Sequence, residues 1–347
     1  MGQRPSPPSG VTLFAVAILA ALACAACERK STAGAARAGE ARETGSGEPA
    51  GAARRAAPTV ASLSPAATDI LLGVGAADHL VAVSNYDPGD NPAVAGLPRV
   101  GDYRTQDWEK LAALRPAKMV VQLHPDRTPA GLRDRAKGLG IELVNVQIDT
   151  LDDVLNAIPR LAEASGEPEK GRAALEKLKA QLDTVRHRVA AAPKVRTLVV
   201  VDVGGRSVAG PGTFLHDILT IAGGENAAAD LGNAWPTVDR EKIAQLRPEV
   251  VIHLLPAAPP QVLAQAKQFW AAMPDLPAVK NQKVHYLTDS FVLLPGYRLG
   301  DLAEQFALVL HPFANVGPLD QRLKEQGLLD PPRPATGGRD DSSSPSR

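Results

Sequence analysis

The chain has 347 residues, a length that suggests two domain-sized cores rather than one. Its 38 basic residues balance 38 acidic residues, so its formal net charge is zero. Because binding of nucleic acid phosphates requires a basic surface, this balance argues against nucleic acid as the main partner.

Residues 1–27 have the pattern of a secretory signal. An apolar run, VTLFAVAILAALACAAC, is too short for an ordinary membrane span and ends in small residues. The end of this run resembles the lipobox of bacterial lipoproteins, although the usual leucine three positions before the cysteine is missing. Cys27 is the better lipidation candidate, because the apolar run stops there; Cys24 and ordinary signal cleavage are the alternatives. We therefore expect an exported protein that is anchored to a bacterial membrane through Cys27.

Two further segments carry few large apolar residues. Residues 28–57 are expected to form a disordered tether between the lipid and the fold. Residues 316–347 are expected to form a C-terminal tail that is largely disordered. No cysteine follows Cys27, so the exported body is expected to have neither an internal disulfide nor a thiolate metal site.

From Thr59 onward, short apolar strands alternate with helical segments. In the first half, the predicted strands are 59–64, 80–84, 118–123 and 141–146. Predicted helices lie between them at 65–76, 107–116 and 128–140. This alternation indicates a parallel sheet that is covered on both faces.

A longer helix is predicted in the middle of the chain. Apolar residues recur there at spacings of three and four, at Leu175, Leu178, Leu182, Val185 and Val189. Prolines at 168 and 193 delimit a helix of about 24 residues, roughly 36 Å long.

The first pattern then restarts. Strands are predicted at 195–203, 249–255 and 283–287, and helices at 212–224, 239–248, 265–273 and 296–312. We therefore predict an N-terminal α/β lobe at 58–150, a linker with a long bridging helix at 151–193, and a C-terminal α/β lobe at 194–315.

The two predicted lobes share a repeated sequence. DWEKLAALRPAKMVVQL at 107–123 and DREKIAQLRPEVVIHLL at 239–255 coincide in register at seven residue types within ten positions, and DIL at 69–71 recurs at 217–219. An aromatic residue stands four positions before each longer copy, at Tyr103 and Trp235. The acid that opens each copy, Asp107 or Asp239, is well placed as a helix N-cap. A match this dense predicts a duplicated structural unit.

These segments, with VASLSPAATDILLGVGAADHLVAVSNYDP, GPGTFLHDILTIAGGEN and YRLGDLAEQFALVLHP, carry a family resemblance. The chain resembles the substrate-binding proteins of ABC importers for cobalamin, haem and ferric siderophores over nearly all of 58–312. The resemblance implies an α/β fold of two Rossmann-like lobes that are joined by one long rigid α-helix, with a ligand cleft between the lobes. A single joining helix favours modest rocking over a large closure.

The resemblance also assigns a role to two glutamates. Members of this family present one surface glutamate on each lobe to the arginines of an ABC transporter permease dimer, and Glu109 and Glu241 match those positions. Two acidic tips on equivalent lobes suit a two-fold symmetric partner. The simpler interpretation is that a glutamate in a first helical turn only stabilises its own helix.

Seven residues are candidate ligand contacts, because they fall in loops at the expected crevice of such sheets. They are Tyr86, Tyr103, Trp235, Asp289, Phe291, Tyr297 and Arg298. Flat aromatic side chains suit a large macrocycle, and Tyr86 and Trp235 resemble positions of the cobalamin-binding member. Arg298 is an alternative contact for an anionic chelate. Core packing is the competing interpretation for Phe291 and Tyr297. A corrinoid is the expected ligand, ahead of haem or a ferric siderophore.

Other classes of function are less consistent with the chain. It has no dinucleotide fingerprint, P-loop, nucleophile elbow or zinc signature, so we expect a binding protein and not an enzyme on this scaffold. The sequence contains no histidine-rich loop, so a bare metal site is not expected. His124 alone is a weak candidate for a ligand of haem iron. We expect a monomer with no resident cofactor. A sensor or interaction lipoprotein that lost transport stays an alternative.

Overall fold

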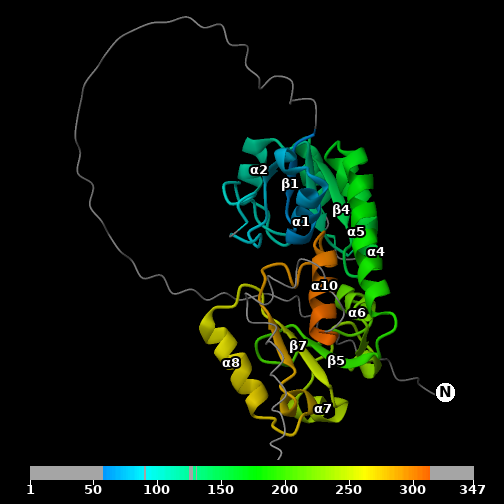
Figure 1. Cartoon of the computed structure of the whole chain (residues 1–347). Coiled ribbons are helices and arrows are strands. Elements are labelled where there is room, and N and C mark those ends of the chain that lie inside the picture. Colours follow the sequence, from blue (N-terminus) through cyan, green and yellow to red (C-terminus); the bar gives the residue numbers. More distant parts are fainter. Residues whose placement is uncertain (1–57, 90, 125–127, 130, 313–347) are drawn as a thin grey trace, which may run out of the picture. The chain divides into compact units, whose positions relative to one another are not determined.

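The computed structural model describes residues 58–89, 91–124, 128–129 and 131–312. Its strands form two parallel four-stranded sheets, in the order β2-β1-β3-β4 and β6-β5-β7-β8 (Figure 1). The first sheet contains β1 (Val60–Ser62), β2 (Leu80–Ala82), β3 (Lys118–Gln122) and β4 (Glu142–Val146). The second contains β5 (Val195–Val200), β6 (Gly224–Asn226), β7 (Val250–Leu254) and β8 (Val284–Leu287). The prediction of two α/β lobes is confirmed.

Four predictions from the sequence lie outside the described residues. These are the signal peptide at 1–27, the lipidated Cys27, the tether at 28–57 and the tail at 316–347.

The first lobe contains three helices before the linker, and a side chain caps the first two of them. These helices are α1 (Pro65–Val74), α2 (Trp108–Leu114) and α3 (Leu132–Gly138). The strand predicted at 59–64 ends at Ser62, because the hydroxyl of Ser64 accepts a hydrogen bond from the backbone N–H of Ala67 and so caps α1.

The second lobe repeats this arrangement with a different set of helices. They are α6 (Phe214–Ile221), α7 (Arg240–Leu246), α8 (Pro260–Ala271), α9 (Pro277–Lys280) and α10 (Leu299–Leu310). The strand β6 was not predicted, because it has only three residues and contains a glycine.

Two helices occupy the predicted linker. The predicted long helix is α5 (Pro168–Val189), which has 22 residues and buries Leu178, Leu182 and Val185. The other helix, α4 (Leu151–Ala164), was not predicted separately; it begins at a capping box between Thr150 and Asp153. Within the described part of the chain, no helix is both long and apolar enough to cross a bilayer.

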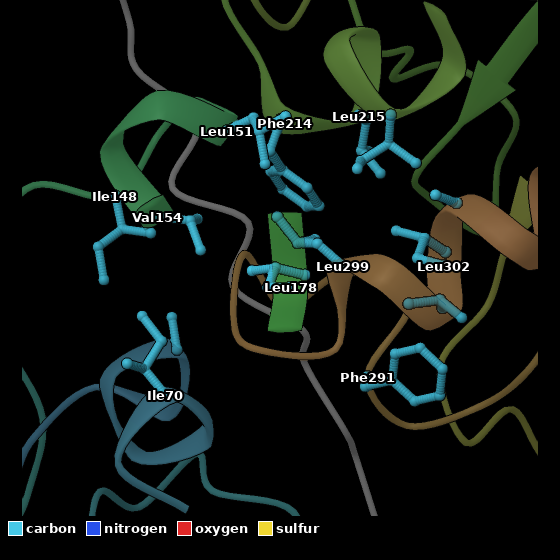
Figure 2. Packing of buried hydrophobic residues seen from close by; sticks show 14 of the residues in the cluster. Ile70, Ile148, Leu151, Val154, Leu178, Phe214, Leu215, Phe291, Leu299 and Leu302 are labelled. Carbon is cyan, nitrogen blue, oxygen red and sulfur yellow. The ribbon is translucent and has the colours of Figure 1, made fainter. Parts of the chain in front are cut away.

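One large hydrophobic cluster draws residues from both lobes. Figure 2 shows Ile70 of α1, Leu178 of α5, Phe214 of α6 and Leu299 of α10, which all belong to this cluster. Each sheet also buries a smaller cluster of its own, around Met119 in the first lobe and Trp270 in the second. Each lobe therefore has a private core, and the helical layer that contains α5 joins the two lobes through a shared core.

Candidate functional site: ligand loops and docking helices

The repeated sequence forms the same local structure in both lobes. Asp107 accepts a hydrogen bond from the backbone N–H of Lys110 (3.0 Å), and Asp239 accepts the equivalent bond from Lys242 (2.7 Å). Both helices end at an arginine in the left-handed region, with a φ of 47° at Arg115 in the first lobe and 48° at its counterpart in the second. The predicted N-caps and the predicted duplication are confirmed.

Glu109 and Glu241 lie in the first turns of these helices, and both are exposed. Their surroundings leave the carboxylates available: Lys110 pairs with Asp107 at 2.9 Å, and among the described residues no ion pair involves either glutamate. Other helical carboxylates, such as Glu176, are paired within their own helix. Among the residues that the structure describes, each lobe therefore has a carboxylate without an ion pair at the same position, where a basic partner could bind.

Tyr86 lies in a loop that follows β2 and is 58% exposed. The loop is held from below by the buried Asp87, whose carboxylate accepts a hydrogen bond from the backbone N–H of Ser84 (2.8 Å). The Arg99 guanidinium donates to the backbone oxygens of Ser84 (2.7 Å) and Asp87 (2.8 Å). Burial raises the pKa of the Asp87 carboxyl to about 6, although the hydrogen bond from Ser84 and the nearby positive charge of Arg99 oppose the shift. The loop therefore presents the Tyr86 ring from a fixed base.

Trp235 is 40% exposed and lies in the loop before α7. The residues on either side of it are tied to a neighbouring segment, since Ala234 accepts a hydrogen bond from the N–H of Gly210 (2.8 Å) and Pro236 accepts one from Val208 (3.1 Å). Only glycine fits at 210, because a Cβ there would lie 2.2 Å from the backbone oxygen of Asn233. This loop, too, holds an exposed aromatic ring on a fixed backbone.

Two other candidate ligand residues have local partners. Tyr103 is half-buried against the smaller core cluster of the first lobe, with the Arg104 guanidinium 5.6 Å from its ring centre. Asp289 is half-buried and accepts a hydrogen bond from Gln305 at 2.7 Å. Their contact with a ligand stays a prediction.

The last three candidates, Phe291, Tyr297 and Arg298, lie together at a joint between the lobes. Asp69 of α1 accepts hydrogen bonds from the backbone N–H groups of Tyr297 (2.7 Å) and Arg298 (3.3 Å), and from Nε of Arg298 (2.9 Å). The same guanidinium lies 4.3 Å from the ring centre of Phe291, which is 8% exposed. Tyr297 packs so closely on Gly73 that a Cβ there would lie 2.1 Å from the ring. The structure thus gives all three residues a structural partner, and their ligand contact stays untested.

A second joint repeats the first with the lobes exchanged. Asp217 of α6 accepts a hydrogen bond from the backbone N–H of Leu151 (3.0 Å), at the start of α4. Asp69 and Asp217 are the two aspartates of the repeated DIL. Asp69 therefore binds two backbone N–H groups, and Asp217 binds one, at the start of the helix that follows the last strand of the other lobe. The repeat was visible in the sequence, but this role was not assigned to it.

His253, within β7, is fully buried and bonded through both ring nitrogens. Its Nε2 lies 2.7 Å from the backbone oxygen of Asp202, and its Nδ1 accepts a hydrogen bond from the Trp270 indole (3.0 Å). Burial lowers its pKa, so the ring is neutral and donates from Nε2. In the described ranges, no group of three or more His, Cys, Asp or Glu residues is arranged to hold a metal ion.

The protein has two α/β lobes, each with a parallel sheet, and the lobes share a helical core. Together with the exposed aromatic rings on loops that hydrogen bonds hold, this arrangement is that of a two-lobed binding protein. A sequence profile of the periplasmic binding protein family matches residues 60–290, which is more than half of the chain. The chain therefore belongs to the periplasmic binding protein family.

Individual relatives agree with this assignment. The vitamin B12-binding protein of Vibrio cholerae is 28% identical over 253 residues, which cover 72% of this chain and 88% of that protein. The crystal structure of the Vibrio cholerae periplasmic vitamin B12-binding protein superimposes with a TM-score of 0.62 at 27% identity, over 74% of this chain and 98% of that chain. A periplasmic haem-binding protein from Roseiflexus sp. RS-1 shares the fold, with a TM-score of 0.63 at 21% identity over 74% of this chain and 99% of that chain.

The family defines the general function. The protein is a substrate-binding component of an ABC importer, which acts outside the cytoplasm on a small ligand and has a permease as its partner. Members of this family are transport components without enzymatic activity, so the expectation that the protein is not an enzyme is confirmed.

Proposed function

We propose that this protein captures a corrinoid of the cobalamin type between its two lobes and delivers it to the permease. The observation that carries the proposal is the pair of exposed rings at Tyr86 and Trp235. Each ring stands on a loop that backbone hydrogen bonds already hold, so little conformational entropy is lost when a ligand binds. Broad aromatic faces suit a flat macrocycle. The similarity to vitamin B12-binding relatives supports the same choice.

To identify the ligand, the purified protein is titrated with cobalamin, cobinamide, haem and ferric siderophores, and binding is measured by absorbance and calorimetry. We expect a corrinoid to bind most tightly. Tyr86→Ala and Trp235→Ala should each weaken binding about tenfold, because each removes roughly 1 to 2 kcal/mol of apolar and stacking contact. Tyr86→Phe is the matched control, because it keeps the ring and should bind nearly as well as the wild type. Preferential binding of haem or a siderophore would replace the corrinoid, and binding of none of these ligands would favour a sensor without a transport role.

Docking to the permease is proposed to use Glu109 and Glu241. The support is their equivalent position in a duplicated unit, their exposure, and the absence of an ion pair to either one within the described residues. Charge reversal of both residues should abolish ligand-stimulated ATP hydrolysis by the transporter and leave ligand affinity unchanged. Reversal of two exposed helical glutamates elsewhere, Glu163 and Glu176, is the matched control. If the first double variant stimulates ATP hydrolysis normally, the two glutamates only stabilise their helices.

Anchoring through a lipid on Cys27 is also proposed, because this cysteine ends the apolar run of a signal-like segment. Mass spectrometry of the membrane-bound protein should find an acylated N-terminal cysteine, and Cys27→Ser should release the protein from the membrane. Acylation that persists in Cys27→Ser but disappears in Cys24→Ser would move the anchor to Cys24.

A further inference from the structure

An open hollow of about 540 Å³ lies beside α2, the helix of the first lobe that carries Glu109. Trp108 and Glu109 of α2 line one side, and Arg135 and Gly138 of α3, with Leu139, line the other. Leu139 is 39% exposed, one of four large hydrophobic residues of the described chain with such exposure. Trp108 also packs against the smaller core cluster of the first lobe, whereas Leu139 belongs neither to a core cluster nor to the proposed ligand loops.

A contact between two of the lining residues fixes the two sides of the hollow relative to each other. The Arg135 guanidinium lies 4.8 Å from the ring centre of Trp108, so a cation–π contact ties α3 to α2. Gly138 leaves the floor open, because a Cβ at this position would meet no atom within 4 Å. Trp108, Leu139 and the Arg135 methylenes offer apolar contact, while Glu109 adds a carboxylate to the lining.

The second lobe carries a different chemistry at the corresponding place. The repeat aligns Trp108 with Arg240, whose guanidinium lies 5.1 Å from the ring centre of Phe269 on α8. The aromatic and cationic partners are therefore exchanged between the helices of the two lobes. The two acidic tips have the same carboxylate but stand next to different surfaces.

We propose that this hollow is a docking socket that receives an apolar side chain from a permease loop. This side chain would lie next to the basic permease residue that pairs with Glu109. The inference rests on the proposed docking function and adds the chemistry of one contact. Charge complementarity identifies the occupant: Glu109 has no ion pair among the described residues, whereas the Arg135 guanidinium is already placed on Trp108. An exposed charge pair mainly sets the association rate, whereas an apolar side chain in a pocket slows dissociation.

Filling the hollow separates these two contributions. Gly138→Leu places a side chain in open space at the last residue of α3, so the fold should tolerate it and the thermal midpoint should not fall. Gly96→Leu is the matched control, because a Cβ there also meets no atom within 4 Å. Binding is measured by surface plasmon resonance to the permease–ATPase complex of the same organism in lipid nanodiscs.

We expect Gly138→Leu to dissociate at least tenfold faster than the wild type, with its association rate and corrinoid affinity unchanged. Glu109→Gln should instead lower the association rate. If Gly138→Leu and Gly96→Leu both dissociate like the wild type while charge reversal at Glu109 and Glu241 abolishes docking, the socket is refuted and the docking function stands. If charge reversal has no effect either, both fail. A wild-type dimer in sedimentation that Gly138→Leu dissociates would assign the hollow to a second copy and overturn the proposal.

Discussion

Removing the Asp69 carboxylate should weaken the joint between the lobes more than any single surface change. Asp69 is 8% exposed and accepts three hydrogen bonds, two from backbone N–H groups at the start of α10 and one from Arg298. Asp69→Ala leaves those N–H groups without this acceptor and the guanidinium without its carboxylate. Loss of one partner from a buried ion pair costs about 3 to 5 kcal/mol. Because the Arg298 side chain is 35% exposed and can be rehydrated, we expect the lower end, about 3 kcal/mol.

The free energy of unfolding is measured by urea titration, with circular dichroism and tryptophan fluorescence as the readouts. Asp69→Asn keeps one acceptor oxygen without the charge and should lose about half as much, roughly 1.5 kcal/mol. The exposed Asp275→Ala is the matched control, and a change within 0.5 kcal/mol is expected there, roughly as for other surface substitutions. A loss below about 1 kcal/mol for Asp69→Ala would show that this joint contributes little to stability and would refute the reasoning.

Three further predictions concern the loop, the joint and the docking helices. Asp87→Asn should become more stable relative to wild type as the pH rises from about 4 to 7, because burial raises the pKa of Asp87 from 3.8 to about 6 and the folded state therefore favours the protonated acid. The stability that the protonated Asp87 contributes to the wild type is fully present below the pKa of the unfolded state and is lost as the pH rises through the pKa of the folded state. The stability of Asp87→Asn relative to the wild type should therefore rise by at most about 3 kcal/mol between low and neutral pH. A relative stability that does not change with pH in urea titrations would contradict this prediction. Gly73→Val should cost about 1 to 3 kcal/mol, since its Cβ would collide with the Tyr297 ring, and an unchanged midpoint would show that the ring moves aside freely. Asp107→Ala and Asp239→Ala should each lower the free energy of unfolding through loss of an N-cap, and their effects should add in the double variant; strong non-additivity would mean that the two helices are coupled.

The alternation of strands and helices was predictable because each element carries its own signal. The β7 strand is apolar except for His253, and Pro65 and Ser64 mark the start of α1 before any tertiary contact is considered. Errors concentrate where the local signal is weak: β6 has three residues, and α4 follows β4 closely enough to be merged into the linker. The paired N-caps were predictable for the same reason, since a cap depends on residues within one helical turn.

The candidate site divides along the same line. Exposed aromatic residues in loops and glutamates in a repeated motif could be selected from residue type and spacing alone, which is why Tyr86, Trp235, Glu109 and Glu241 were chosen. Asp69 could not be assigned to Arg298 in this way, because the two residues are 229 positions apart and only folding brings them together. The same applies to the hollow between α2 and α3, which depends on how two helices pack.

Order along the chain, periodicity and the internal repeat were enough to define two similar α/β halves and the helix between them, because those features arise from contacts close in sequence. Only the packed molecule showed that each half caps a helix of the other, and that the two acidic tips stand beside different surfaces. These features depend on side chains from distant segments meeting in space, and residue patterns within one segment carry no information about such meetings.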